Sequence, residues 1–109
     1  MTEITKKYLV DIIFSIELID DFFINCTSFI DYKLDLKTKS AVERQLIIIG
    51  EIINKIKKVD DLEISHSIEI INFRNRFVHA YDSIDDAIVW AIKHNHLPKL
   101  KTEVEALLK

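Results

Sequence analysis

The sequence predicts an all-α protein, an antiparallel bundle of four or five helices. The chain has 109 residues, of which one is Gly and one is Pro. Sandwiches, barrels and doubly wound sheets need many more turn residues of these two types. Apolar residues recur at steps of three and four along most of the chain, which is the period of an α-helix. Because helices joined by short loops pack antiparallel, these features together favour a bundle.

The first part of the chain predicts one long helix and a short helical turn. Apolar residues from Ile4 to Phe23 fall on one helical face, with acidic residues between them. Asn25, Thr27 and Ser28 can end this helix and cap a short turn at Phe29 to Lys33, because their side chains bond free backbone groups at helix ends. We expect the chain to bend there.

A second long helix is expected from Leu36 to Asp61. Its apolar run from Leu46 to Ile49 contains β-branched residues that would suit a strand, but the helical periodicity on both sides outlasts an ordinary strand. Gly50 lies inside this helix, where Gly costs about 1 kcal/mol relative to Ala. A glycine at this place indicates that another backbone or side chain comes close.

A third helix is expected to end near Tyr81, where Asp82 and Ser83 interrupt the pattern. Either Ser65 or Ser67 can cap its N-terminus.

The last part of the chain predicts two more helical segments. One begins near Asp85, and Pro98 fits the first turn of a final helix that ends at Leu108. No repeat, linker or low-complexity tract divides the chain, so residues 1–109 are expected to form a single domain.

Composition limits the classes of function. The formal net charge is −3, so nucleic-acid binding requires a local basic patch or a groove built by several chains. The lysines at 55, 57 and 58 are expected to be a solvated helix end rather than a track for RNA. The single cysteine, Cys26, excludes an intramolecular disulfide and fits a reducing compartment. The longest aliphatic run is far shorter than the ~18 residues of a membrane span, so a cytoplasmic protein without membrane contact is expected.

Arg74 stands out because it falls in the middle of the apolar arc of the third helix. A guanidinium stays charged, so burial requires a carboxylate, a cleft or a ligand phosphate. Taken alone, Arg74 is best explained by an internal ion pair with Glu43, Glu51 or Glu69, with Glu51 as the leading candidate. Asn75 and His79 lie four residues apart on the adjoining polar arc, close enough to share a ligand.

With Tyr81, these residues match the pattern R-x4-H-x-Y, and the sequence resembles the HepT toxins of the HEPN superfamily. Two further blocks carry the resemblance. Residues 41–56 read AVERQLIIIGEIINKI and resemble the helix of that family with its Arg and Gly-Glu pair, and residues 83–90 read SIDDAIVW. Three ordered blocks at the family's spacing are far more specific than the short motif alone.

The resemblance implies a HEPN-like helical homodimer that acts as a metal-independent endoribonuclease, with the motifs of two subunits facing a shared cleft. It also implies the toxin of a type VII-like toxin–antitoxin system. The antitoxin would be an MNT-type nucleotidyltransferase that transfers AMP from ATP to the hydroxyl of Tyr81. No cofactor and no metal ion are implied.

The residues themselves are compatible with cleavage of RNA, which carries its own nucleophile in the 2′-OH. His79 could act as general base or acid, Arg74 could bind the phosphate through its planar fork, and Asn75 could orient the hydroxyl or the imidazole. Glu51 and Arg76 are candidates for supporting roles. An ideal helix separates Arg74 from His79 by ~140°, so either the helix distorts near His79 or two copies of the chain pool their groups.

Other interpretations stay open from the sequence alone. Tyr81 could simply pack beside Phe77, and His94 and His96 lack the spacing of paired metal ligands. The main alternative function is a non-catalytic helical subunit that binds substrate for a small nucleotidyltransferase. A third alternative is a helical scaffold in which Arg74 forms a structural ion pair.

Overall fold

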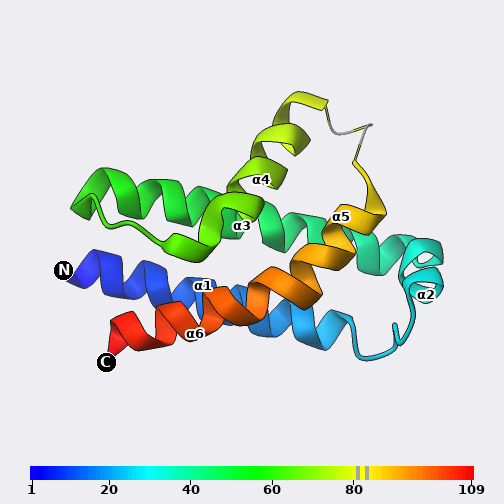
Figure 1. Cartoon of the computed structure of the whole chain (residues 1–109), viewed down its shortest axis with the longest axis horizontal. Coiled ribbons are helices and arrows are strands. Elements are labelled where there is room, and N and C mark those ends of the chain that lie inside the picture. Colours follow the sequence, from blue (N-terminus) through cyan, green and yellow to red (C-terminus); the bar gives the residue numbers. More distant parts are fainter. Residues whose placement is uncertain (81, 83) are drawn as a thin grey trace.

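The computed structural model describes residues 1–80, 82 and 84–109, and the regular elements in these ranges are all helices (Figure 1). The α-helices are α1 (Glu3–Phe22), α2 (Phe29–Leu34), α3 (Leu36–Asp60), α4 (Ile68–Ala80), α5 (Asp86–Ala91) and α6 (Leu97–Leu108). A 3-10 turn, η1 (Ser65–Ser67), precedes α4, and a π-helical turn, η3 (Ile92–His96), joins α5 to α6. The predicted all-α fold is therefore confirmed, including helix rather than strand for the β-branched run of α3.

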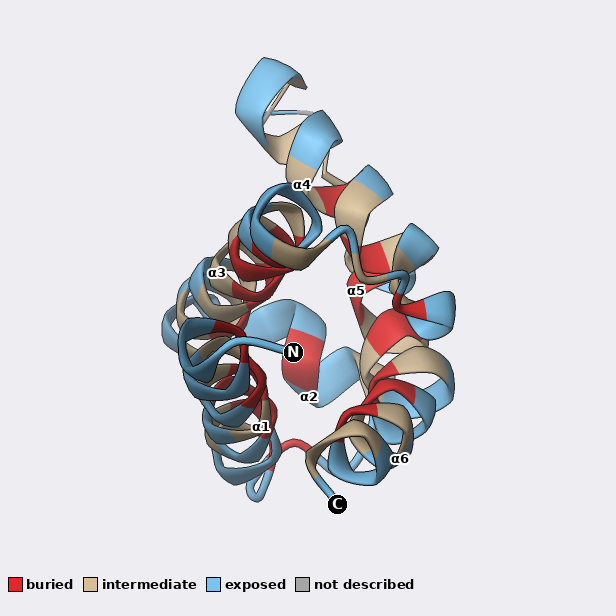
Figure 2. Cartoon of the chain, turned by 90° about the vertical axis from the view of Figure 1, so that its left-hand side faces the viewer, coloured by how far each residue is buried: buried red, intermediate tan, exposed pale blue. Residues whose placement is uncertain are grey.

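The core lies between α1, α3 and the continuous segment from α5 to α6. Helices α1 and α3 run antiparallel, and α6 packs on α1 from another side (Figure 1). Figure 2 shows that the buried positions of these helices face one another across the interior. Fully buried residues at helical spacing include Leu9, Ile12, Ile16, Ile19, Leu46, Ile49, Ile56, Leu100 and Val104. Burial of such side chains contributes roughly 1.5–3 kcal/mol each, so this apolar stripe is what holds the bundle together.

Side-chain caps explain where several helices begin. Thr2, Ser28, Asp35 and Asp85 each accept a backbone N–H at the start of α1, α2, α3 and α5, with donor–acceptor distances between 2.8 and 3.1 Å. Such caps satisfy backbone donors that have no partner within the helix. The roles predicted for Ser28 as a cap and Asp85 as a helix start are confirmed.

The predicted cap of the third long helix is wrong. The Ser67 hydroxyl donates to the carbonyl of Ile64 at 2.6 Å instead of accepting an amide hydrogen. The backbone amides of Ser65 and His66 are bound by the carboxylate of Glu103, at 2.7 and 2.9 Å. Glu103 belongs to α6, so the segment before α4 is tied to the last helix by a contact that local sequence cannot reveal.

Helix α4 is anchored only by its first half. Its buried residues are Ile70 and Phe73, and every described residue that follows in α4 is exposed or half-buried. Figures 1 and 2 show this later half projecting away from the other helices. The residues predicted to carry chemistry therefore lie on the projecting end of a helix. Within the described residues, no helix combines the length and apolar character needed to cross a membrane.

Asp35 should link helix capping to acid stability. Hydrogen bonds from the backbone amide and hydroxyl of Thr38 lower the pKa of the Asp35 carboxyl. A carboxyl whose pKa is lower in the folded state stabilises the fold above its unfolded-state pKa of about 3.9, and this stabilisation is lost as the pH falls through the folded-state pKa.

We expect Asp35→Ala to lower the thermal unfolding midpoint at pH 7 and Asp35→Asn, which retains a capping oxygen, to lower it less. The unfolding midpoint of wild type should drop more steeply below about pH 4 than that of Asp35→Asn. Equal acid sensitivity of the two proteins would contradict this role.

Candidate active site

Gly50 permits a close approach of α3 and α4. A Cβ atom placed at Gly50 would lie 2.8 Å from Cβ and 3.1 Å from Cγ of Arg74, and 3.6 Å from the carbonyl oxygen of Ile70. Carbon atoms make their best contact at about 3.5–4.0 Å, so no side chain fits there without moving α4. The expectation that a glycine marks a close contact is confirmed, and the residue in contact is Arg74.

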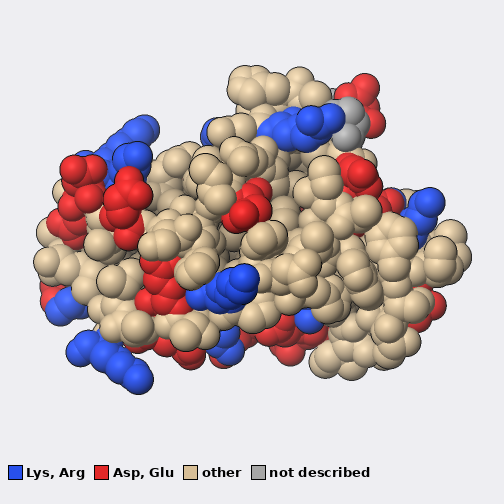
Figure 3. Space-filling view, viewed as in Figure 1, with Lys and Arg blue, Asp and Glu red and all other residues tan. Residues whose placement is uncertain are grey.

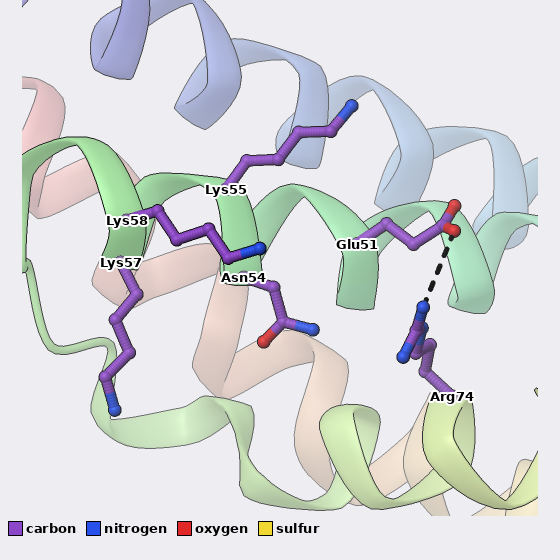
Figure 4. Close-up of a pocket in the computed structure, with 6 residues that line it drawn as sticks. All are labelled: Glu51, Asn54, Lys55, Lys57, Lys58 and Arg74. Carbon is purple, nitrogen blue, oxygen red and sulfur yellow. Dashed lines mark ion pairs between the residues drawn. The ribbon is translucent and has the colours of Figure 1, made fainter.

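The guanidinium of Arg74 is held loosely. Its Nη2 lies 3.9 Å from Oε2 of Glu51 (Figure 4), and its Nη1 donates to Oδ1 of Asn75 at 3.2 Å. The Nε atom is buried and has no hydrogen-bond partner among the described residues. The side chain of Arg74 is 28% exposed and that of Glu51 is 46% exposed. The predicted Glu51 pair is present, but a long, solvated pair of this kind contributes only about 0–1 kcal/mol, so Arg74 remains able to bind an anion.

His79 points to a different side of α4 from Arg74. No non-helical residue interrupts α4 between Ile68 and Ala80, so the ideal separation of ~140° between residues five apart holds. His79 is exposed in the last turn, and the exposed Asn75 lies between the two directions. The distortion that would bring both groups to one stripe is therefore not observed within α4.

Two pockets lie beside the part of α4 that carries Arg74 and Arg76. The first, of about 450 Å³, lies between α3 and α4 and contains Arg74 (Figure 4). The second, of about 330 Å³, lies between α4 and α5 and contains Arg76, which is exposed. Arg76 and Asn72 are on the same side of α4 as His79, within about 60° on the helical wheel. The described linings of both pockets leave out His79 itself, so neither of these two pockets contains Arg74 together with His79.

The first pocket also contains residues that the sequence analysis did not assign to the site. Its lining consists of Glu51, Asn54, Lys55, Lys57, Lys58 and Arg74. Glu51, Asn54 and Lys58 are spaced i, i+3 and i+7, which places them on one stripe of α3. The sequence shows that these three residues share one stripe of α3. It does not show that Arg74 of α4 lies opposite that stripe, which is what makes them part of the pocket.

Two residues of the sequence blocks, Tyr81 and Ser83, lie outside the described residues. In the described part of the chain, no group of three or more His, Cys, Asp or Glu side chains is placed to hold a metal ion.

A family model described as "Ribonuclease HepT-like" matches residues 12–107. The chain belongs to the HepT-like ribonuclease family. The resemblance drawn from Arg74, His79 and the flanking blocks is thereby confirmed at the level of the family, and α3, α4 and both pockets lie within the matched region.

Similar proteins cover nearly the whole HepT-like chain. A protein of Thermococcus cleftensis named probable ribonuclease HepT is 38% identical over 108 residues, which are 95% of this chain and 96% of the relative. Two proteins of Methanocaldococcus jannaschii, whose names give RNase as a provisional assignment, are 35% and 29% identical, over 92% and 95% of this chain and 93% and 87% of their own lengths. No solved structure gives a significant match.

Substitution of Gly50 should test the contact between α3 and α4. In an ordinary exposed helix, Gly→Ala stabilises by about 1 kcal/mol. We expect Gly50→Ala to destabilise the HepT-like fold by roughly 1–3 kcal/mol instead, because the new Cβ overpacks against the stem of Arg74. Urea unfolding measures the sign directly. Ser40→Ala, at an exposed position of the same helix, is the matched control, and a stabilised Gly50→Ala protein would contradict the contact.

Proposed function

We propose that this HepT-like chain is a metal-independent endoribonuclease in which Arg74, Asn75 and His79 act on RNA. The observation that carries the proposal is the state of Arg74, which is partly exposed, incompletely hydrogen-bonded and lines a pocket rich in cations. A purely structural arginine would be expected to have its donors satisfied. Membership of the HepT-like ribonuclease family supports the same conclusion.

The chemistry needs no metal ion because the substrate supplies the nucleophile. His79 takes the proton of the 2′-OH as the 2′-oxygen attacks the adjacent phosphorus, and the bond from phosphorus to the 5′-oxygen breaks. The leaving 5′-oxygen takes a proton from solvent, and a 2′,3′-cyclic phosphate remains on the other fragment. Arg74 stabilises the charge on the non-bridging oxygens through its planar fork. Asn75, which already accepts a hydrogen bond from Arg74, orients the guanidinium.

We place the reacting phosphate between two copies of the chain. In one copy, Arg74 and His79 point in directions ~140° apart along an undistorted helix. The projecting half of α4 leaves Val78 51% exposed and Phe77 half-buried, which gives a second α4 an apolar surface to pack on. A two-fold axis beside this surface would bring His79 of one subunit toward Arg74 of the other and double the local positive charge. Glu51 and Arg76 flank this arrangement from either side of α4.

Within this proposal the protein is the toxin of a type VII-like toxin–antitoxin system in the cytoplasm, built from residues 1–109 as one domain. An MNT-type nucleotidyltransferase neutralises it by transferring AMP to Tyr81. The hydroxyl attacks the α-phosphate of ATP, and pyrophosphate leaves. The added phosphate brings negative charge and bulk within two residues of His79, which repels RNA.

Purified protein should cleave RNA in excess chelator, and single-stranded DNA should stay intact because it lacks the 2′-OH. We expect His79→Ala to reduce the cleavage rate by roughly 10²–10⁴-fold, the usual contribution of a general acid or base. Arg74→Ala should reduce it by about 10²–10³-fold. Lys99→Ala, which removes an exposed charge on α6, serves as the control. Nucleotide binding without RNA cleavage in wild type would favour a non-catalytic partner subunit instead.

Tyr81→Phe should separate neutralisation from catalysis. The variant should keep RNA cleavage close to that of wild type, because the proposed chemistry does not use the phenol. Incubated with an MNT-type partner and ATP, wild type should gain the mass of one or more AMP groups and lose activity, whereas Tyr81→Phe should show neither change. Intact-mass spectrometry measures the AMP gained by each protein. A mass gain on Tyr81→Phe would show that a residue other than Tyr81 is modified.

A further inference from the structure

The pocket between α3 and α4 extends well beyond Arg74. Four of its six lining residues are cationic, namely Lys55, Lys57, Lys58 and Arg74, and one, Glu51, is acidic. This local excess stands out because the whole chain has a formal charge of −3. Over the face drawn in Figure 3, acidic and basic groups are interspersed. The pocket is therefore a local basic surface of the kind that an acidic chain needs to bind a polyanion.

The lysines in this pocket are not equivalent. Lys57 points toward the segment that joins α3 to α4 and lies 3.8 Å from the carboxylate of Glu63 (Figure 4). Among the described residues, Lys55 and Lys58 form no ion pair, and both are exposed. Figure 4 shows Lys58 extending along α3 toward Asn54, and Lys55 leaving the other side of the same turn. Lys58 therefore brings an unpaired ammonium group to the side of α3 that faces Arg74, and Lys55 borders the pocket from the other side of the helix.

The arrangement along α3 has a direction. Glu51, which faces Arg74, and Lys58 are seven residues apart, which is about 10 Å along the helix axis. Asn54 lies between them on the same stripe and contributes an amide that can donate to a phosphate oxygen. A ligand that contacts both Arg74 and Lys58 must lie lengthwise along α3. A single inorganic anion is too small to do so, whereas a nucleic-acid strand carries a phosphate at every nucleotide.

We propose that Asn54, Lys55 and Lys58 bind backbone phosphates of the RNA strand next to the phosphate held at Arg74, so that the substrate runs along α3 in single-stranded form. This inference rests on the proposed ribonuclease function and specifies its substrate path. The contacts are to phosphate, so they contribute affinity and position without selecting a base sequence. Lys58 belongs to the last turn of α3, where a cation also stabilises the helix, so the test must separate RNA binding from folding.

The test measures binding rather than cleavage. A fluorescent 2′-O-methylated RNA of about twelve nucleotides, within the usual site size of single-strand binders, cannot be cut and is titrated by anisotropy at several salt concentrations. Single-stranded binding changes with a slope of about 0.7 in log Kd against log salt for each neutralised phosphate. We expect Lys55→Gln with Lys58→Gln to weaken binding and to lower this slope by about 1.4, which corresponds to two lost contacts.

The matched control removes the same charge elsewhere. Lys33→Gln with Lys99→Gln changes two exposed lysines, in α2 and α6, that form no ion pair among the described residues. This control variant should have the same slope of log Kd against log salt as wild type. Urea unfolding of both double variants shows whether the fold is preserved. The proposal would be overturned if the double variant Lys55→Gln with Lys58→Gln had the same salt slope as wild type.

It would also be overturned if that double variant lost ATP binding while its RNA binding stayed unchanged, which would indicate a nucleotide site instead. Failure of wild type to cleave any RNA would instead refute the proposed function and leave this binding result standing.

Discussion

The close packing of α4 against α3 at Gly50 is the constraint on which the site depends. Because Gly50 has no side chain, the stem of Arg74 can approach α3 closely. A Cβ atom placed on Gly50 would lie only 2.8 Å from the Cβ of Arg74. This contact directs the guanidinium to Glu51 and into the pocket with Asn54 and Lys58. It also anchors the first half of α4 and leaves the second half, which carries His79, projecting from the bundle. The glycine at position 50 therefore determines both where the guanidinium of Arg74 lies and how far the proposed acid–base group, His79, is exposed.

Much of the fold could be predicted because it depends on local periodicity and capping. The apolar spacing in α1 and α3 identified both helices, and Ser28 identified the start of α2. The cap before α4 could not be predicted, because the carboxylate of Glu103 reaches the amides of Ser65 and His66 from a helix about 38 residues later. The place of Pro98 in the first turn of α6 and the end of α6 at Leu108 could also be predicted. The π-helical turn η3, which joins α5 directly to α6, could not, because helical periodicity does not distinguish such a turn.

The candidate site was predictable in its residue types but not in its geometry. Arg74 could be identified because it places a charge within the apolar arc of its helix. Since such a charge needs a carboxylate partner, its ion pair with Glu51 could be predicted as well. The sequence could not decide between a distorted helix and two pooled copies, because that depends on whether α4 stays regular, and it does up to Ala80. From the sequence alone, the lysines of α3 are expected to form a solvated helix end rather than a track for RNA. They are exposed, but they also border the pocket of Arg74, a relation that only the packing of α4 creates.

Subunit complementation tests most directly whether Arg74 of one copy acts with His79 of another. Arg74→Ala and His79→Ala proteins, each inactive alone, are unfolded together, refolded as a mixture and assayed on RNA in chelator. A heterodimer of these two chains retains one site with both groups intact, so the mixture should recover about a quarter of wild-type activity if random pairing makes half of the dimers mixed. Activity no higher than that of the separate variants, in a mixture shown to contain heterodimers, would contradict a site shared between subunits.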